Sequence, residues 1–194
     1  MKTKQLVIIL LAFGLLLGGA LILYRTLGSS YSPTQQLAQQ PSTDTSSPSG
    51  SSDASNPGKT KAWDITFYDA QDAKHKLSDF EGKPVVLSFW ADWCSACKGH
   101  MPYLHDSYLA NKDVHFIMLN IPNNQAAITR SKAYLNTQGY TFPFYHDIDQ
   151  ISTYTYSIEY FPTTFFIDSE GYLAGYYVGQ LNPQLLEQGL SLIR

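Results

Sequence analysis

The stretch Phe89-Trp90-Ala91-Asp92-Trp93-Cys94-Ser95-Ala96-Cys97-Lys98 contains both cysteines of the chain, separated by two residues. The residues from Pro84 to Trp90 are β-branched and aromatic, which is typical of a strand buried on both faces. Residues 98–109 then predict a helix. A cysteine at such a junction lies near a helix N-terminus, where unpaired N–H groups and the helix dipole favour a thiolate. The stretch therefore predicts a redox pair, in which Cys94 attacks and Cys97 resolves.

Two other readings of the cysteine pair have less support. A zinc site usually needs four ligands, and His105 falls more than two helical turns beyond Cys97, so no metal site is predicted. A structural disulfide across two residues would remove little chain entropy and would stabilise the fold weakly. Neither reading uses the position of the pair at the end of a buried strand.

A second motif, Tyr156-Ser157-Ile158-Glu159-Tyr160-Phe161-Pro162-Thr163-Thr164-Phe165-Phe166-Ile167-Asp168-Ser169-Glu170-Gly171, follows later in the chain. Together the two motifs resemble the thioredoxin superfamily, and within it the membrane-anchored, extracytoplasmic branch represented by the TlpA and ResA proteins. The resemblance covers residues 63–194. It implies an α/β thioredoxin-like fold with a central mixed β-sheet flanked by helices. It also implies a thiol-disulfide oxidoreductase whose only redox group is the disulfide, without another cofactor.

The resemblance assigns a role to Pro162. It implies a cis peptide bond between Phe161 and Pro162, packed beside the cysteines, whereas a plain turn proline at a strand start is the alternative. With a cis bond, the backbone of Phe161 would be free to pair with an extended substrate by strand addition. By the same resemblance, Trp93 shields the sulfurs, and Trp93, Phe161 and Pro162 together form the substrate-binding site.

Two residues depart from the family pattern. Cytoplasmic thioredoxins carry a buried aspartate six residues before the first cysteine, where this chain has Ser88, and ResA-like proteins carry a glutamate where it has His100. Since Cys97 and His100 lie on neighbouring turns of one helix face, His100 is a candidate for tuning a cysteine pKa. A protonated His100 would lower that pKa, a neutral one would serve as a base for Cys97, and a solvent-facing one would do neither.

The N-terminal part of the chain predicts a membrane anchor. Residues 6–24 contain no charge and, as a helix, would reach about 28 Å, close to the roughly 30 Å of a bilayer core. The run is longer than the apolar part of a signal peptide and lacks a small-residue cleavage site, which favours an uncleaved helix over a cleaved leader. The lysines before the run place the N-terminus in the cytoplasm and the rest outside.

The remaining chain divides by composition. Residues 1–27 form the anchor, and residues 28–61, rich in Ser, Thr, Pro and Gln, predict a disordered linker. Residues 62–194 then form one thioredoxin-like domain. Its predicted elements, besides those above, are strands at 65–68, 74–77, 114–121, 163–167 and 172–178, a strand or an extended inserted segment at 141–146, and helices at 125–137, 148–154 and from 183 onward. Asn123-Asn124 is the candidate cap of the helix at 125–137, Gly139 ends that helix, and Asn182-Pro183 begins the last one.

These observations predict a membrane-tethered, extracytoplasmic enzyme with Cys94 and Cys97 as its catalytic residues. By resemblance it reduces disulfides in exported proteins, for example during apocytochrome c maturation, with electrons from a membrane thiol transporter. The alternatives are an oxidase of exported proteins, a thiol peroxidase or methionine sulfoxide reductase partner, and a non-enzymatic binding module. A peroxidatic cysteine normally has a Thr and an Arg nearby, and Arg130 is distant in sequence. The net charge of −3 predicts no nucleic acid partner.

Overall fold

The computed structural model describes residues 58–194. The predicted membrane anchor and nearly all of the predicted linker lie outside the described residues. Within 58–194, no helix has the length and apolar character needed to cross a membrane. The sequence predicts the domain from residue 62, but Thr60 and Lys61 already lie against the sheet: Thr60 C=O accepts from Leu173 N–H, and Lys61 forms a bridge with Tyr172.

Within the described residues, seven strands form one mixed sheet in the order β2-β1-β5-β4-β3-β6-β7. The strands are β1 (Thr66–Asp69), β2 (Lys74–Lys76), β3 (Val85–Trp90), β4 (His115–Asn120), β5 (Phe144–His146), β6 (Thr163–Ile167) and β7 (Leu173–Val178). Strands β3, β4 and β5 run parallel, and the remaining pairs run antiparallel. The predicted mixed sheet is thereby confirmed.

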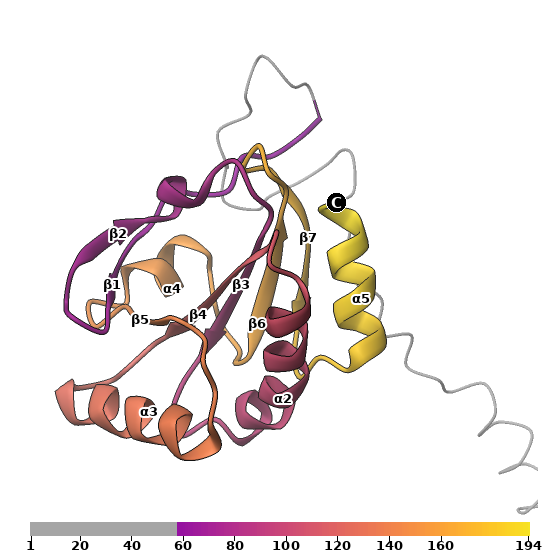
Figure 1. The fold of residues 1–194 in the computed structure, drawn as a ribbon. Helices are drawn as coiled ribbons and strands as arrows, with labels where there is room; N and C mark the ends of the chain where they lie inside the picture. Colours follow the sequence, from indigo (N-terminus) through magenta and orange to yellow (C-terminus); the bar gives the residue numbers. More distant parts are fainter. Residues whose placement is uncertain (1–57) are drawn as a thin grey trace, which may run out of the picture. The chain divides into compact units, whose positions relative to one another are not determined.

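Within residues 58–194, three α-helices and one short 3-10 helix lie between strands, and a fourth α-helix follows the last strand. They are η1 (Leu77–Phe80), α2 (Ser95–Ala110), α3 (Gln125–Gln138), α4 (Ile151–Thr155) and α5 (Pro183–Leu192). The helix ends follow the sequence signals: Asn124 and Asn182 accept capping hydrogen bonds at the starts of α3 and α5, and Gly139 ends α3 in the left-handed conformation. Figure 1 shows β3 in the middle of the sheet, with α2 and α5 close together.

Two apolar cores lie on the two faces of the sheet. One core joins strand residues such as Val86, Trp90 and Met118 to side chains of α2, α3 and α5. The other contains Leu87 and Phe89 from the same strand β3 and no residue of those three helices. Because successive side chains of a strand point to opposite faces, β3 supplies both cores and is buried throughout, as predicted.

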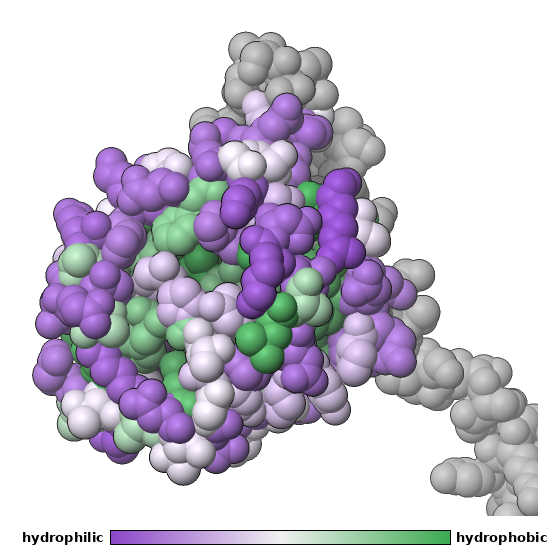
Figure 2. Space-filling model, in the orientation of Figure 1, coloured by the Kyte–Doolittle hydropathy of each residue, from purple (hydrophilic) through white to green (hydrophobic). Residues whose placement is uncertain are grey.

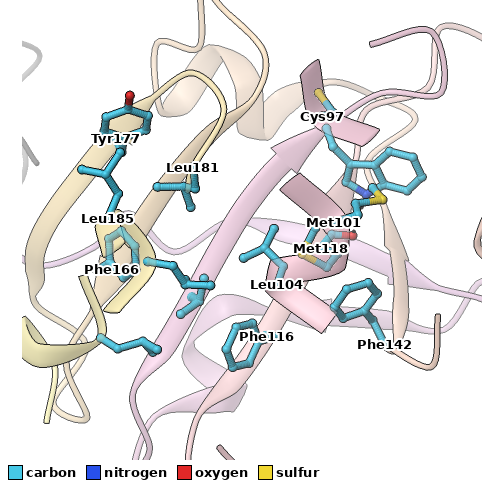
Figure 3. Packing of buried hydrophobic residues seen from close by; sticks show 14 of the residues in the cluster. Cys97, Met101, Leu104, Phe116, Met118, Phe142, Phe166, Tyr177, Leu181 and Leu185 are labelled. Carbon is cyan, nitrogen blue, oxygen red and sulfur yellow. Dashed lines mark hydrogen bonds between the residues drawn. The ribbon is translucent and has the colours of Figure 1, made fainter. Parts of the chain in front are cut away.

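The first of these cores reaches the redox pair. Figure 3 shows Cys97, Met101 and Leu104 on α2 within the same packed cluster as Leu181 and Leu185. On the face drawn in Figure 2, the described surface is mostly hydrophilic, with apolar residues in small separate patches. Because Cys97 lies in this packed cluster, its side chain is fixed by close packing and not held in a mobile loop.

Candidate active site

The two cysteines form a disulfide at the carboxyl end of β3 and the first turn of α2. Their Cα atoms are 5.3 Å apart, and Cys94 Sγ accepts a hydrogen bond from Cys97 N–H at 3.1 Å. Helix α2 starts at Ser95, three residues before the predicted Lys98, because Cys94 itself is the N-cap residue. This capping geometry places Cys94 Sγ at the positive end of the helix dipole, where a thiolate is favoured.

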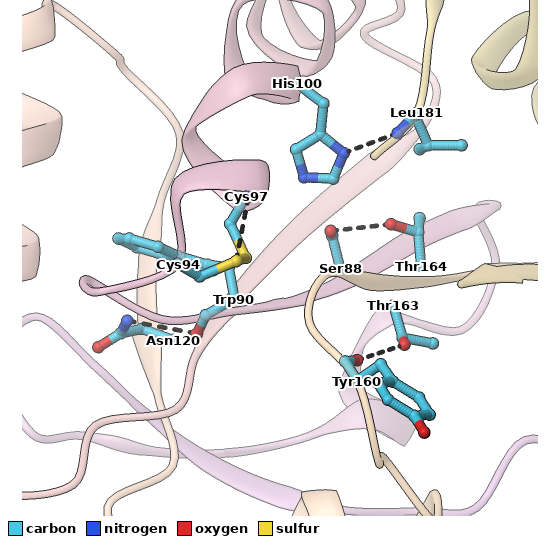
Figure 4. The surroundings of a disulfide bond; sticks show 10 residues. All are labelled: Ser88, Trp90, Cys94, Cys97, His100, Asn120, Tyr160, Thr163, Thr164 and Leu181. Carbon is cyan, nitrogen blue, oxygen red and sulfur yellow. Dashed lines mark hydrogen bonds between the residues drawn. A yellow bond between two sulfur atoms is a disulfide. The ribbon is translucent and has the colours of Figure 1, made fainter. Parts of the chain in front are cut away.

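The two sulfurs differ in their access to solvent. Cys94 is 5% exposed, whereas Cys97 is fully buried among the core residues beneath α2. Figure 4 shows the disulfide at the end of the helix, with Trp90 and Asn120 beside it. An external thiolate or disulfide can therefore reach only the Cys94 side, and Cys97 is placed to attack from within.

The peptide bond between Phe161 and Pro162 is cis, as the family resemblance implied. Pro162 is buried at the start of β6, which pairs with β3. Within residues 58–194, the backbone N–H and C=O of Phe161 take part in no hydrogen bond. They are consequently available to an extended chain that lies beside the redox pair.

Trp93 and Phe161 meet next to the disulfide. Their ring centroids are 5.7 Å apart and the rings are nearly perpendicular. Trp93 is 61% exposed and Phe161 is half-buried. The contact links the loop before α2 to the cis-proline loop and offers an apolar surface beside Cys94.

His100 is fully buried and does not face solvent, so that reading of the sequence is wrong. Its Nδ1 accepts a hydrogen bond from Leu181 N–H at 3.3 Å. Burial lowers the pKa of His100 from 6.5 to about 4, so the ring is neutral at pH 7 and the protonated alternative is also wrong. Because Nδ1 accepts, the neutral ring carries its proton on Nε2.

The Nε2–H group of His100 has no hydrogen-bond partner among the described residues. Figure 4 shows this edge of the ring turned toward the side where Cys97 and Ser88 lie. The ring is therefore a hydrogen-bond donor on that side, whereas a proton-accepting His100 would need the other tautomer and would lose the bond to Leu181. The role of neutral His100 as a base for Cys97 stays a prediction, and the tautomer set by Leu181 favours a donor at Nε2.

Ser88 is buried in the middle of β3, opposite Thr164 on β6. The two hydroxyl oxygens are 2.9 Å apart and share a hydrogen bond. A hydroxyl pair is not ionised at neutral pH. The position held by an aspartate in cytoplasmic thioredoxins therefore carries no charge in this chain.

Asp92 and Arg130 form an ion pair that sequence reasoning missed. Arg130 Nε, on α3, donates to Asp92 Oδ2 at 2.6 Å, only two residues before Cys94. Arg130 is distant from the cysteines in sequence, but the ion pair places it beside the loop that carries Cys94. Its Nε is nevertheless already bound to a carboxylate, so the contact gives the peroxidase alternative no support. A lone arginine on a helix gave no signal for this pairing.

Comparisons with known proteins agree with this geometry. Residues 59–175 match the model of the AhpC/TSA family. The chain is 29% identical to the thiol-disulfide oxidoreductase ResA of Geobacillus kaustophilus, over 68% of this chain and 75% of that protein. It is 33% identical to ResA of Bacillus anthracis, over 64% of this chain and 72% of that protein.

Solved structures give the same result for the fold. The pneumococcal exposed lipoprotein thioredoxin of Streptococcus pneumoniae superposes with a TM-score of 0.56 at 27% identity, covering 66% of this chain and 98% of that one. StoA of Bacillus subtilis superposes with a TM-score of 0.57 at 20% identity, covering 66% of this chain and 96% of that one. With its Cys94–Cys97 disulfide, the chain is a thiol-disulfide oxidoreductase of thioredoxin-like fold, and it belongs to the AhpC/TSA family.

Proposed function

We propose that the chain reduces disulfides in exported proteins from a position tethered to the outer face of the cell membrane. The observation that carries this proposal is the asymmetry of the redox pair. Cys94 is the accessible sulfur at the helix N-terminus beside a cis-proline, and Cys97 is sealed in the core. Such an arrangement suits the capture of a disulfide by one sulfur and its release by the other.

The reaction consists of two thiol-disulfide exchanges. The Cys94 thiolate attacks one sulfur of the substrate disulfide, which forms a mixed disulfide and releases the first substrate thiolate. Cys97, once deprotonated, attacks Cys94 Sγ, which forms the Cys94–Cys97 disulfide and releases the second substrate thiolate. Two electrons pass from the protein to the substrate, and the two released thiolates take up two protons.

Each neighbouring residue has a role in this scheme. The backbone of Phe161 pairs with the extended substrate segment, Pro162 holds that backbone in place, and Trp93 covers the sulfurs between turnovers. His100 tunes the pair as a neutral donor, because its Nε2–H stabilises a developing thiolate on Cys97 and makes the disulfide easier to reduce. No other cofactor is needed, because the reduced thiols of Cys94 and Cys97 supply both electrons.

The cellular setting rests on the sequence. Residues 1–27 would anchor the chain with its N-terminus in the cytoplasm, residues 28–61 would act as a linker, and residues 62–194 would act outside the membrane. A membrane thiol transporter would return two electrons to the oxidised pair. The family resemblance supports exported proteins, such as apocytochromes c, as clients.

The test is the reduction potential of the Cys94–Cys97 pair in the full chain, equilibrated against glutathione or dithiothreitol, together with alkylation trapping of its redox state in cells. A low potential with a mostly reduced pair supports the reductase. A high potential with a mostly oxidised pair would make the protein an oxidase of exported proteins. Cys94→Ala is the control, because a variant that rescues the deletion phenotype would exclude catalysis by the pair.

A further inference from the structure

The segment Gly179–Leu181, between β7 and α5, holds two parts of the redox site together. Gly179 N–H donates to Pro162 C=O at 2.8 Å, on the cis-proline loop. Leu181 N–H donates to His100 Nδ1 at 3.3 Å, on the redox helix, and the Leu181 side chain is buried in the core that contains Cys97. The residue between them, Gln180, is thus fixed on both sides next to the redox pair.

The side chain of Gln180 lies directly on the backbone of α2 at Gly99. A Cβ added to Gly99 would stand 2.8 Å from Gln180 Nε2 and 2.9 Å from Oε1, closer than van der Waals contact permits. Gly99 lies one helical turn beyond Ser95 and Ala96, the two residues between the cysteines. A glycine disfavours the helix, and here its missing side chain leaves the space that the Gln180 amide occupies.

Gln180 is an exposed residue, and its side-chain amide makes no hydrogen bond to the other residues of 58–194. A primary amide offers one acceptor oxygen and two N–H donors, which matches the C=O and N–H of a peptide backbone. The N–H and C=O of Phe161, on the cis-proline loop that Gly179 contacts, likewise take part in no hydrogen bond among the described residues. An extended polypeptide that crosses Cys94 would meet hydrogen-bonding groups from both loops.

We propose that Gln180 is a substrate-recognition residue that hydrogen-bonds the peptide backbone of an extended client segment next to the cysteine under attack. The inference rests on the proposed function and narrows it to a substrate class. Disulfides in polypeptides gain this contact from the chain that flanks their cysteine, whereas oxidised glutathione has only one residue on each side of each cysteine and offers no extended strand to the two loops. Gly99 acts as a positioning residue, because it keeps the Gln180 amide against the helix.

The test compares two substrates with the full chain: insulin as a polypeptide disulfide and oxidised glutathione as a small one. Gln180→Ala is expected to lower kcat/KM for insulin by about three- to tenfold, the effect of one lost hydrogen bond, and to leave the glutathione rate within about twofold. Gly99→Ala should lower the insulin rate in the same way, because its methyl group displaces the amide. Gln138→Ala, at the exposed end of α3, is the matched control and should change neither rate.

The double variant Gly99→Ala/Gln180→Ala should be no slower with insulin than Gln180→Ala alone, because both changes remove one interaction. An equal loss with insulin and oxidised glutathione in Gln180→Ala would overturn the proposal, since the residue would then act on the redox pair itself. Unchanged rates with both substrates would overturn it as well. A wild-type chain no faster than Cys94→Ala with either substrate would instead contradict the proposed function.

Discussion

His100 on the redox helix and Leu181 before the last helix are joined by a hydrogen bond from Leu181 N–H to His100 Nδ1, across 81 residues of sequence. The bond fixes the ring orientation and leaves the proton of the neutral imidazole on Nε2. It also makes the environment of Cys97 depend on the C-terminal part of the domain. A buried donor is costly when it has no acceptor, as is the case for His100 Nε2–H among residues 58–194, and the proposed thiolate on Cys97 would supply one.

The first prediction concerns the reduction potential. His100→Leu removes the Nε2–H donor and so destabilises a thiolate on Cys97, which makes the reduced form less favourable. The potential should fall by about 30 mV, which corresponds to about 1.4 kcal/mol for two electrons. Equilibration with glutathione measures the reduction potential of the Cys94–Cys97 pair in both proteins. His100→Gln keeps an N–H donor and should restore part of the change, whereas a higher potential in His100→Leu would contradict the donor role.

The second prediction concerns stability in acid. The pKa of His100 is lowered to about 4 by burial, whereas an unfolded histidine titrates near 6.5. Between these pH values the unfolded chain binds more protons than the folded one. The contribution of neutral His100 to the free energy of unfolding is therefore complete above pH 6.5 and is lost as the pH falls toward 4. At pH 4.5 the lowered pKa reduces the free energy of unfolding by roughly 2 to 3 kcal/mol relative to neutral pH.

Urea unfolding of the oxidised protein at pH 7.5 and pH 4.5 tests this prediction, because the thiols then do not titrate. The loss of stability between the two pH values should be smaller in His100→Gln than in the wild type. Carboxylates titrate in both proteins, so the comparison isolates the histidine. Equal losses in the two proteins would show that His100 is protonated as easily in the folded state as in the unfolded chain.

The third prediction concerns the ion pair beside Cys94. The Asp92 side chain is 9% exposed and its Oδ1 has no partner among the described residues, so Arg130 is its main compensation. Arg130→Met should destabilise the domain by about 1 to 2 kcal/mol, less than for a fully buried pair because Arg130 is half-exposed. Asp92→Asn/Arg130→Met should recover part of the loss in urea unfolding, and a double variant as unstable as the sum of the single ones would exclude the coupling.

Local sequence signals predicted much of this fold. Asn124, Gly139 and the Asn182-Pro183 pair mark helix ends in the structure as they do in the sequence, because caps act through neighbouring backbone groups. The buried strand β3 was recognisable from its composition alone. The start of α2 was placed three residues late, because a cysteine is not a usual N-cap and gives no signal of its own.

The surroundings of the redox pair depended on contacts between distant segments. The hydrogen-bond partner of His100 is Leu181 and the partner of Asp92 lies on α3, so neither contact follows from residues near Cys94. The predicted helix at 148–154 starts at Ile151 instead, because Gln150 adopts a left-handed conformation just before it. Sequence periodicity indicates which residues face a core. The contacts of His100 and Asp92 depend instead on which helices and loops pack together in the folded domain.

The last prediction compares two helix glycines. Gly189 on α5 is buried, and a Cβ there would overlap the ring of the fully buried Phe166, whereas a Cβ at Gly99 would meet only the flexible end of Gln180. Gly189→Ala should destabilise the domain by about 1 to 3 kcal/mol through overpacking. Gly99→Ala should be neutral or stabilising by up to about 1 kcal/mol, because alanine favours a helix. Urea unfolding of both variants measures the contrast, and Phe166→Leu should relieve part of the cost of Gly189→Ala. A stabilising Gly189→Ala would mean that α5 does not pack on β6 at this ring, and a destabilising Gly99→Ala would mean that Gln180 cannot move aside.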